Sequence, residues 1–216
     1  MSFDVEVYWS FRSPYSYLAV HRLQEIERTY DARVNMRPVY PLAVRQPNFF
    51  EQVNPQWIAY LRIDCPRIAQ MAGIPFAWPN PDPIVQDMKT RKIAAEQPYI
   101  RRLTRLGAAA VEQGRGLPFI AEVSRLIFGG VAGWNEGDHL QRAAERAGLD
   151  LALLDRLITE NADRYEEQIA ANEAAQRAAG HWGVPLMTFN GEPFFGQDRI
   201  DLLLWRMQQS GLQRRS

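Results

Sequence analysis

The sequence has only one cysteine, Cys65, among its 216 residues. A single cysteine excludes an intramolecular disulfide, and it cannot form a cysteine-based metal site by itself. The three histidines, His21, His139 and His181, show no ligand spacing with one another or with this cysteine, so we expect no metal site. Cys65 is most simply a small buried side chain, and its solitary presence is typical of a reducing compartment.

The chain also lacks an excess of charge of either sign and lacks a long hydrophobic run. Lysine plus arginine and aspartate plus glutamate both number 25, so the formal net charge is zero. No segment concentrates the basic residues as nucleic-acid binding requires, and no run approaches the roughly 18 apolar residues of a membrane span. Acids near the N-terminus, Asp4 and Glu6, stand where a signal peptide needs basic and apolar residues. We therefore expect a cytoplasmic protein that binds neither nucleic acid nor membranes.

What the chain does have is a globular composition, with 46% hydrophobic and 23% charged residues. Residues 3–11 alternate and are rich in aromatic and β-branched side chains, which predicts a strand. Ser13 is a good N-cap and Pro14 suits the first helical position, so a helix should follow at once and run to about Tyr30. Residues 34–40 then predict a second strand. Such a strand, helix and strand unit favours parallel pairing.

The middle of the chain has helical periodicity, and strand patterning returns only near the end. In the predicted helix over residues 58–72, Pro66 should kink the helix or start it afresh. After Gly183 a hairpin is predicted from residues 186–190 and 193–195 around Asn190-Gly191, before a last helix over 200–209. The predicted helices of the middle cover residues 58–72, 85–112, 117–128, 139–147, 151–158 and 164–178.

This element order is that of an α/β protein with a thioredoxin-like fold interrupted by an all-helical insertion. Residues 1–45 and 180–216 would form the thioredoxin-like domain, and residues 46–179 the inserted helical domain. In such a fold the reactive position lies between the first strand and first helix, where the helix N-terminus stabilises an anion.

That position reads Ser13-Pro14-Tyr15-Ser16, so neither cysteine of a redox pair is present and dithiol–disulfide exchange is excluded there. The anion-stabilising helix end and its hydroxyl donors remain. A site that keeps the positive electrostatic field of the helix N-terminus but has no sulfur of its own could hold the thiolate of an external thiol. Glutathione is the obvious such thiol. A serine hydroxyl that donates a hydrogen bond to this sulfur would lower its pKa.

Three motifs together resemble one family: residues 9–19 (WSFRSPYSYLA), 183–185 (GVP) and 194–199 (FFGQDR). They are similar to 2-hydroxychromene-2-carboxylate isomerases and the related kappa-class glutathione transferases, of the DsbA-like branch of the thioredoxin superfamily. The resemblance extends over the whole chain, since residues 60–79 also resemble the inserted domain of the family. It implies an isomerase of aromatic-compound catabolism that interconverts 2-hydroxychromene-2-carboxylate and trans-o-hydroxybenzylidenepyruvate. Glutathione would be its cofactor. Its thiolate would add to the conjugated substrate, the former double bond would rotate, and elimination would return the thiol unchanged.

The resemblance also implies roles for particular residues. Ser13 matches the catalytic serine at the glutathione sulfur. Val184 precedes Pro185, a cis proline in the family, and its backbone would pair with the tripeptide. Gln197 and Asp198 match the residues that hold the γ-glutamyl end; Asp198 could also cap the final helix, and the two roles can coexist because a cap leaves one carboxylate oxygen free.

Asn48 falls where the kappa enzymes place a glutathione-contacting asparagine. A lysine commonly seen in the family is missing at the position of Trp57. The acceptor would be a small aromatic molecule, and rings are plausible walls for it. The candidate rings are Trp9, Tyr15, Trp57, Tyr60, Trp78 and Trp182.

Two alternatives remain beside the isomerase. A kappa-class glutathione transferase would share the thiolate site and differ in whether the adduct is released or reversed. A redox-inactive thioredoxin-like module would instead hold extended peptides at Val184 and Pro185, with no affinity for glutathione. Related folds often pair as homodimers, and we expect the same here.

Overall fold

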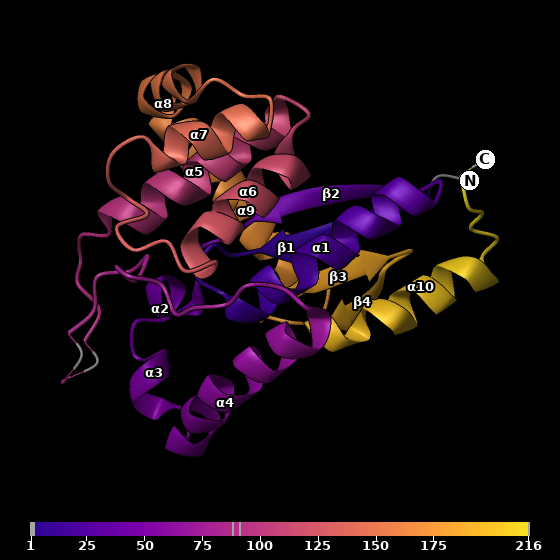
Figure 1. Ribbon diagram of the computed structural model, residues 1–216, viewed down its shortest axis with the longest axis horizontal. Coiled ribbons are helices and arrows are strands. Elements are labelled where there is room, and N and C mark those ends of the chain that lie inside the picture. The colour runs from indigo at the N-terminus through magenta and orange to yellow at the C-terminus, as the bar shows by residue number, and fades with distance from the viewer. Residues whose placement is uncertain (1–2, 88, 91, 216) are drawn as a thin grey trace.

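One four-stranded sheet built from both ends of the chain organises the molecule. The computed structural model describes residues 3–87, 89–90 and 92–215 (Figure 1). The strand order is β2-β1-β3-β4; β1 and β2 are parallel, and β3 is antiparallel to both β1 and β4. The strands are β1 (Asp4–Trp9), β2 (Arg33–Pro38), β3 (Leu186–Phe189) and β4 (Glu192–Phe195).

The first three elements form as the sequence predicts. β1 is central, so Val7 pairs with Met36 of β2 on one side and Met187 of β3 on the other. Helix α1 (Pro14–Thr29) follows β1 at once, with Ser13 as its N-cap and Pro14 in its first turn. The parallel pairing of β1 with β2 confirms the predicted strand, helix and strand unit.

The remaining longer helices form a block beside the sheet, a last helix that packs along β3 and β4, and a separate long helix, α4 (Pro55–Ala72), along the lower edge of the view (Figure 1). The last helix, α10, has the predicted bounds of residues 200–209 and follows a 3-10 turn, η1 (Gln197–Arg199). Two helices of four residues each, α2 (Leu42–Arg45) and α3 (Phe49–Gln52), were not predicted. The longer helices are α4 (Pro55–Ala72), α5 (Pro98–Glu112), α6 (Gly116–Phe128), α7 (His139–Arg146), α8 (Leu151–Glu160), α9 (Ala162–Ala178) and α10 (Ile200–Gln209).

The start of one predicted helix is wrong, and so is one of the two alternatives for Pro66, that it starts a new helix. The predicted helix over 85–112 begins only at Pro98, because the side chain of Gln97 occupies the backbone groups of the preceding segment. Its Oε1 accepts from the Val85 N–H at 2.8 Å, and its Nε2 donates to the carbonyl of Val85 at 2.9 Å. Pro66 does not start a new helix, since α4 continues through it to Ala72. Pro66 faces solvent, where the carbonyl that lacks its usual N–H partner can be hydrated.

The hydrophobic core joins the sheet to the helical block. Phe11, just after β1, packs edge-on against Phe119 of α6 with ring centroids 6.4 Å apart. Tyr17 of α1 stacks on Phe128 of α6 at 5.4 Å. Trp9 is fully buried in the same cluster. The end of β1 and the start of α1 are therefore held by packing on both sides. Among the described helices, none is long and apolar enough to cross a membrane.

Candidate active site

Ser13 lies at the junction of β1 and α1 and contacts the far end of the chain. Its Oγ accepts a hydrogen bond from the Ser16 N–H at 3.2 Å, as an N-cap does. The same hydroxyl donates to the carbonyl of Val184, 3.3 Å away and 171 residues further along the chain. The hydroxyl therefore stands between the positive end of α1 and the segment that leads into β3.

The segment beside Ser13 contains the peptide bond Val184-Pro185, which is cis. The carbonyl of Pro185 accepts from the Gly196 N–H at 3.0 Å, which ties this segment to the end of β4. Among the described residues, the N–H of Val184 has no hydrogen-bond partner. Val184 thus offers one free backbone donor next to the hydroxyl of Ser13.

Two residues that sequence reasoning missed hold this segment from behind. Gln176 of α9 donates to the carbonyl of Gly183 at 2.7 Å, and Arg45 of α2 donates to Gln176 at 2.9 Å. Arg45 also donates to the carbonyl of Trp182 at 3.1 Å. Burial lowers the pKa of Arg45, and Gln176 is fully buried. No local pattern in the sequence marks these two side chains, because their partners are remote.

Gln197 and Asp198 lie in η1, directly after the end of β4. Gln197 is half-buried, whereas Asp198 is exposed and pairs with Arg199 at 2.7 Å. Asp198 makes no capping hydrogen bond to η1 or α10, so its interpretation as a helix cap is wrong. Gly196, two residues before Asp198, has a φ of +107°. A Cβ at Gly196 would lie 2.5 Å from Oδ1 of Asp198, so this turn requires glycine. The carboxylate is thereby folded back over the turn and open to solvent.

Asn48 lies between the short helices α2 and α3. It precedes α3, makes no capping hydrogen bond and is exposed. It lines an open hollow of about 370 Å³ together with Gln46, Pro47, Phe49, Gln52 and Val53. The hollow is connected to the segment beside Ser13 by Phe49, whose ring packs against Trp182 at 5.6 Å.

Of the six aromatic rings that the sequence analysis selected as walls, five are exposed or half-buried and one is fully buried. Trp9 is fully buried in the core, so its prediction as a wall is wrong; its position at the inner end of β1 decides this. Trp57, Tyr60, Trp78 and Trp182 each expose 41–57% of their surface, and Tyr15 is half-buried.

Three further rings, which sequence reasoning did not select, complete a row from α4 to β4. Phe49 packs on Trp57 at 6.3 Å and on Trp182 at 5.6 Å. His181 stacks between Trp182 and Phe195, with centroids 5.2 and 3.7 Å from its own. His181 and Phe195 of this row lie against Gly183, so the row leads up to the segment whose Val184 carbonyl accepts from Ser13.

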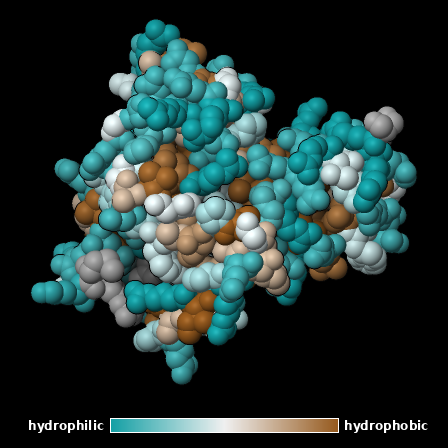
Figure 2. All heavy atoms as spheres, in the orientation of Figure 1, coloured by the Kyte–Doolittle hydropathy of each residue, from teal (hydrophilic) through white to brown (hydrophobic). Residues whose placement is uncertain are grey.

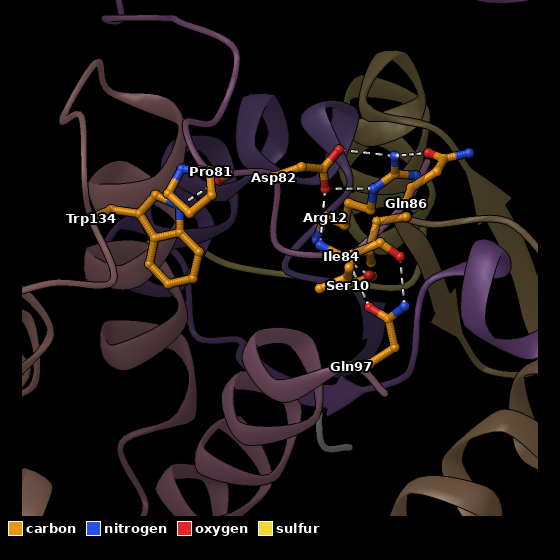
Figure 3. A network of polar contacts seen from close by, with 9 residues as sticks. Ser10, Arg12, Pro81, Asp82, Ile84, Gln86, Gln97 and Trp134 are labelled. Atoms are coloured by element: carbon orange, nitrogen blue, oxygen red, sulfur yellow. Dashed lines mark hydrogen bonds and ion pairs between the residues drawn. The ribbon is translucent and has the colours of Figure 1, made fainter. Parts of the chain in front are cut away.

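Arg12, the residue before Ser13, anchors the turn from the other direction (Figure 3). Its Nε and Nη2 donate to the two carboxylate oxygens of Asp82 at 2.9 and 3.0 Å, and Nη2 also donates to Gln86 at 3.4 Å. Asp82 accepts in addition from the Ile84 N–H at 3.0 Å. The irregular segment between α4 and α5 is thus fastened to the turn between β1 and α1.

Cys65 does not contribute a nucleophile. Its side chain is fully buried, and burial, followed by the nearby charge of Asp64, raises its pKa to about 12. The thiol therefore stays protonated near neutral pH. Within the described part of the chain, no group of three or more histidine, cysteine, aspartate or glutamate side chains is placed to hold a metal ion.

The chain is similar over nearly its full length to known proteins. A family model described as DSBA-like thioredoxin domain matches residues 4–208. The 2-hydroxychromene-2-carboxylate isomerase of Pseudomonas putida is 26% identical, over 92% of this chain and 91% of the relative. The protein of the same name from Sphingobium xenophagum is 25% identical, over 94% and 97%. A solved structure of a 2-hydroxychromene-2-carboxylate isomerase superposes with a TM-score of 0.72 at 23% identity, over 96% and 95%, and shares the fold.

Proposed function

Because the chain belongs to the DSBA-like thioredoxin domain family, and relatives along its whole length are named isomerases, we propose that it is a glutathione-dependent isomerase. Its substrate would be 2-hydroxychromene-2-carboxylate or a closely similar aromatic catabolite, interconverted with trans-o-hydroxybenzylidenepyruvate. The observation that carries the proposal is the hydroxyl of Ser13, which caps α1 and lies 3.3 Å from the carbonyl of Val184.

The donor set fits glutathione. The tripeptide has a thiol in its middle, a backbone on either side and an ammonium group at its γ-glutamyl end. Ser13 and the N-terminus of α1 suit a thiolate, and the unpaired N–H of Val184 suits a peptide carbonyl. Asp198 is an exposed carboxylate whose present partner, Arg199, is also exposed, so an ammonium group can compete for it. Asn48, exposed in the hollow before α3, would be a further contact to the tripeptide.

Ser13 would have the central task in the reaction, which is to stabilise the thiolate. Ser13 accepts from the Ser16 N–H and donates its one proton to the carbonyl of Val184, so it would donate to a bound sulfur by turning this proton away from the carbonyl. One hydrogen bond to a charged acceptor contributes about 1.5–3 kcal/mol. Bound glutathione supplies a thiol that adds to the conjugated acceptor and is eliminated after the former double bond has rotated. The protein orients both partners, and the ring row excludes water on one side.

The proposal is tested first by binding. Reduced glutathione is titrated calorimetrically into the wild-type protein and the Asp198→Asn variant. We expect saturable binding that the variant weakens, because the carboxylate charge that holds the ammonium is lost. An equal dissociation constant in both proteins would remove Asp198 from the γ-glutamyl site.

Turnover then separates the alternatives. An isomerase converts 2-hydroxychromene-2-carboxylate without consuming glutathione. A transferase accumulates a glutathione conjugate with 1-chloro-2,4-dinitrobenzene and leaves the chromene unchanged. A peptide-binding module shows neither reaction and no glutathione binding, and that result would reject the proposal.

Two broader properties are part of the same proposal. The protein would work in the cytoplasm, where reduced glutathione is abundant, and as a homodimer, as related folds often do. Both are open to direct measurement.

A further inference from the structure

A carboxylate on α4 joins two tyrosine hydroxyls close to the proposed catalytic serine. Tyr15 donates to Oδ2 of Asp64 at 2.8 Å, and Tyr60 donates to Oδ1 of the same residue at 3.1 Å. Tyr15 stands in the first turn of α1, two residues after Ser13, whereas Asp64 and Tyr60 are on α4. We call these three residues the tyrosine–aspartate bridge.

Both tyrosines of the bridge act as permanent donors. Burial, followed by the hydrogen bond to Asp64, raises the pKa of Tyr15. The hydrogen bond to Asp64 raises the pKa of Tyr60, which is exposed. Both phenols therefore keep their protons at neutral pH, and the bridge holds the two helices together rather than serving as a base.

The bridge is a polar anchor of one half of α4. The buried residues of this helix, Cys65 and Ala69, both lie after Asp64. Before Asp64 no residue of α4 is fully buried, and only Ile58 and Leu61 are half-buried. The N-terminal half of α4 thus has little core packing to fix its position relative to α1, so the hydrogen bonds of Asp64 have a large share in doing so.

That half of α4 carries two exposed rings. Trp57 and Tyr60, three residues apart, stand 41% and 57% exposed, and Asp64 follows four residues after Tyr60 along the same side of the helix. α4 runs along the lower edge of the molecule (Figure 1), where the space-filling view shows residues of high hydropathy among hydrophilic ones (Figure 2). On the hydropathy scale of that view tryptophan and tyrosine do not count as hydrophobic, so the exposure of these two rings comes from their exposed fractions. Trp57 is also one end of the ring row that leads up to Gly183.

We propose that the tyrosine–aspartate bridge positions the N-terminal half of α4 so that Tyr60 and Trp57 form the wall that receives the aromatic acceptor beside the thiol. Tyr60 is then a specificity-determining residue, and Tyr15 and Asp64 are positioning residues. The inference rests on the proposed function, because it assigns the acceptor side of the same site. It requires no contact of the bridge with glutathione.

The test separates acceptor binding from glutathione binding. Tyr15→Phe keeps the ring and removes the hydroxyl, and Asp64→Asn keeps the size of the side chain and removes the charge. We expect either change to raise KM for the chromene roughly three- to tenfold with a smaller effect on kcat, as expected when one hydrogen bond of positioning is lost. The dissociation constant of glutathione should stay that of the wild type.

A second readout needs no turnover and no glutathione. Binding of trans-2-hydroxycinnamate, an aryl acid with a conjugated side chain, is followed by quenching of tryptophan fluorescence. Its dissociation constant should rise by a similar factor in both variants and in Tyr60→Ala. Asp155→Asn is the matched control, since it removes a two-bond link to Arg102 between α5 and α8, remote in the fold from α4. It should leave hydroxycinnamate binding unchanged.

Each outcome decides between defined alternatives. Unchanged hydroxycinnamate binding in both Tyr15→Phe and Tyr60→Ala would overturn the inference. A wild-type protein that binds hydroxycinnamate but no glutathione would reject the proposed function and leave the acceptor wall standing. If Asp64→Asn fails to fold, shown by its circular dichroism, Tyr15→Phe alone decides.

Discussion

At the scale of single residues, the hydroxyl of Ser13 has both a structural and a proposed chemical role. It caps α1 by accepting from the Ser16 N–H and donates to the carbonyl of Val184. Loss of an N-cap typically costs about 1 kcal/mol of stability, whereas loss of a hydrogen bond to a thiolate costs about 1.5–3 kcal/mol of stabilisation of that anion. The two roles therefore have different readouts.

Replacing Ser13 with alanine should lower turnover roughly 10- to 100-fold while the melting temperature falls by about 2–4 °C. The thiolate absorbance of bound glutathione at 240 nm, followed against pH, reports the thiol pKa directly and should move upward. Ser13→Thr keeps a hydroxyl and is the control. Wild-type turnover in Ser13→Ala would remove the serine from the mechanism.

Cys65 gives a pH-dependent prediction. Its thiol has a folded-state pKa of about 12 against 9.0 for the free side chain, so the unfolded chain loses this proton first. Stability from this group is complete below pH 9 and is lost as pH rises toward 12. Above pH 9 the free energy of unfolding, measured with urea, should fall less steeply with pH in Cys65→Ala than in the wild type. The two slopes should differ by up to about 1.4 kcal/mol per pH unit. Equal slopes would contradict the buried neutral thiol.

At the scale of elements, α9 supports both the sheet and the segment that would bind glutathione. Two buried amides of α9 donate to backbone carbonyls: Gln176 to Gly183 at 2.7 Å, and Asn172 to Pro38 at 3.0 Å. Only the first carbonyl is next to Val184. The pair therefore separates general stability from support of the binding segment.

Replacing Gln176 with leucine leaves the Gly183 carbonyl without its donor, and the matched control Asn172→Leu does the same to the Pro38 carbonyl. Each change should lower the free energy of unfolding, measured with denaturant, by about 1–3 kcal/mol. Only Gln176→Leu should also raise the dissociation constant of glutathione, because only it frees the Val184 segment. Equal glutathione affinity in both variants would show that α9 supports the fold alone.

At the scale of the whole molecule, the expected homodimer can be measured directly. The chain has a mass of 24.8 kDa, so light scattering coupled to size-exclusion chromatography should give twice that value at micromolar concentration. A mass equal to one chain would reject the dimer and leave the proposed glutathione site standing, because the residues assigned to that site all belong to one chain.

Much of the fold could be predicted from the sequence because the signals are local. Ser13 and Pro14 start α1, and residues 200–209 form α10 as their periodicity indicates. Asn190 and Gly191 adopt φ of +51° and +80°, which is the turn that their dipeptide predicts. These features depend on the backbone preferences of neighbouring residues, which the sequence states directly.

The sequence by itself thus determined the fold class, the α1 N-terminus at Ser13 and the order of elements around it. Only the tertiary structure decided what surrounds that serine: that Trp9 is buried, that Gln97 prevents a helix before Pro98, and that Tyr15 meets Asp64. The last pair is 49 residues apart, and Ser13 and Val184 are 171 apart. Local preferences set dihedral angles and periodicity, whereas a contact between remote residues exists only after the chain has packed around its core.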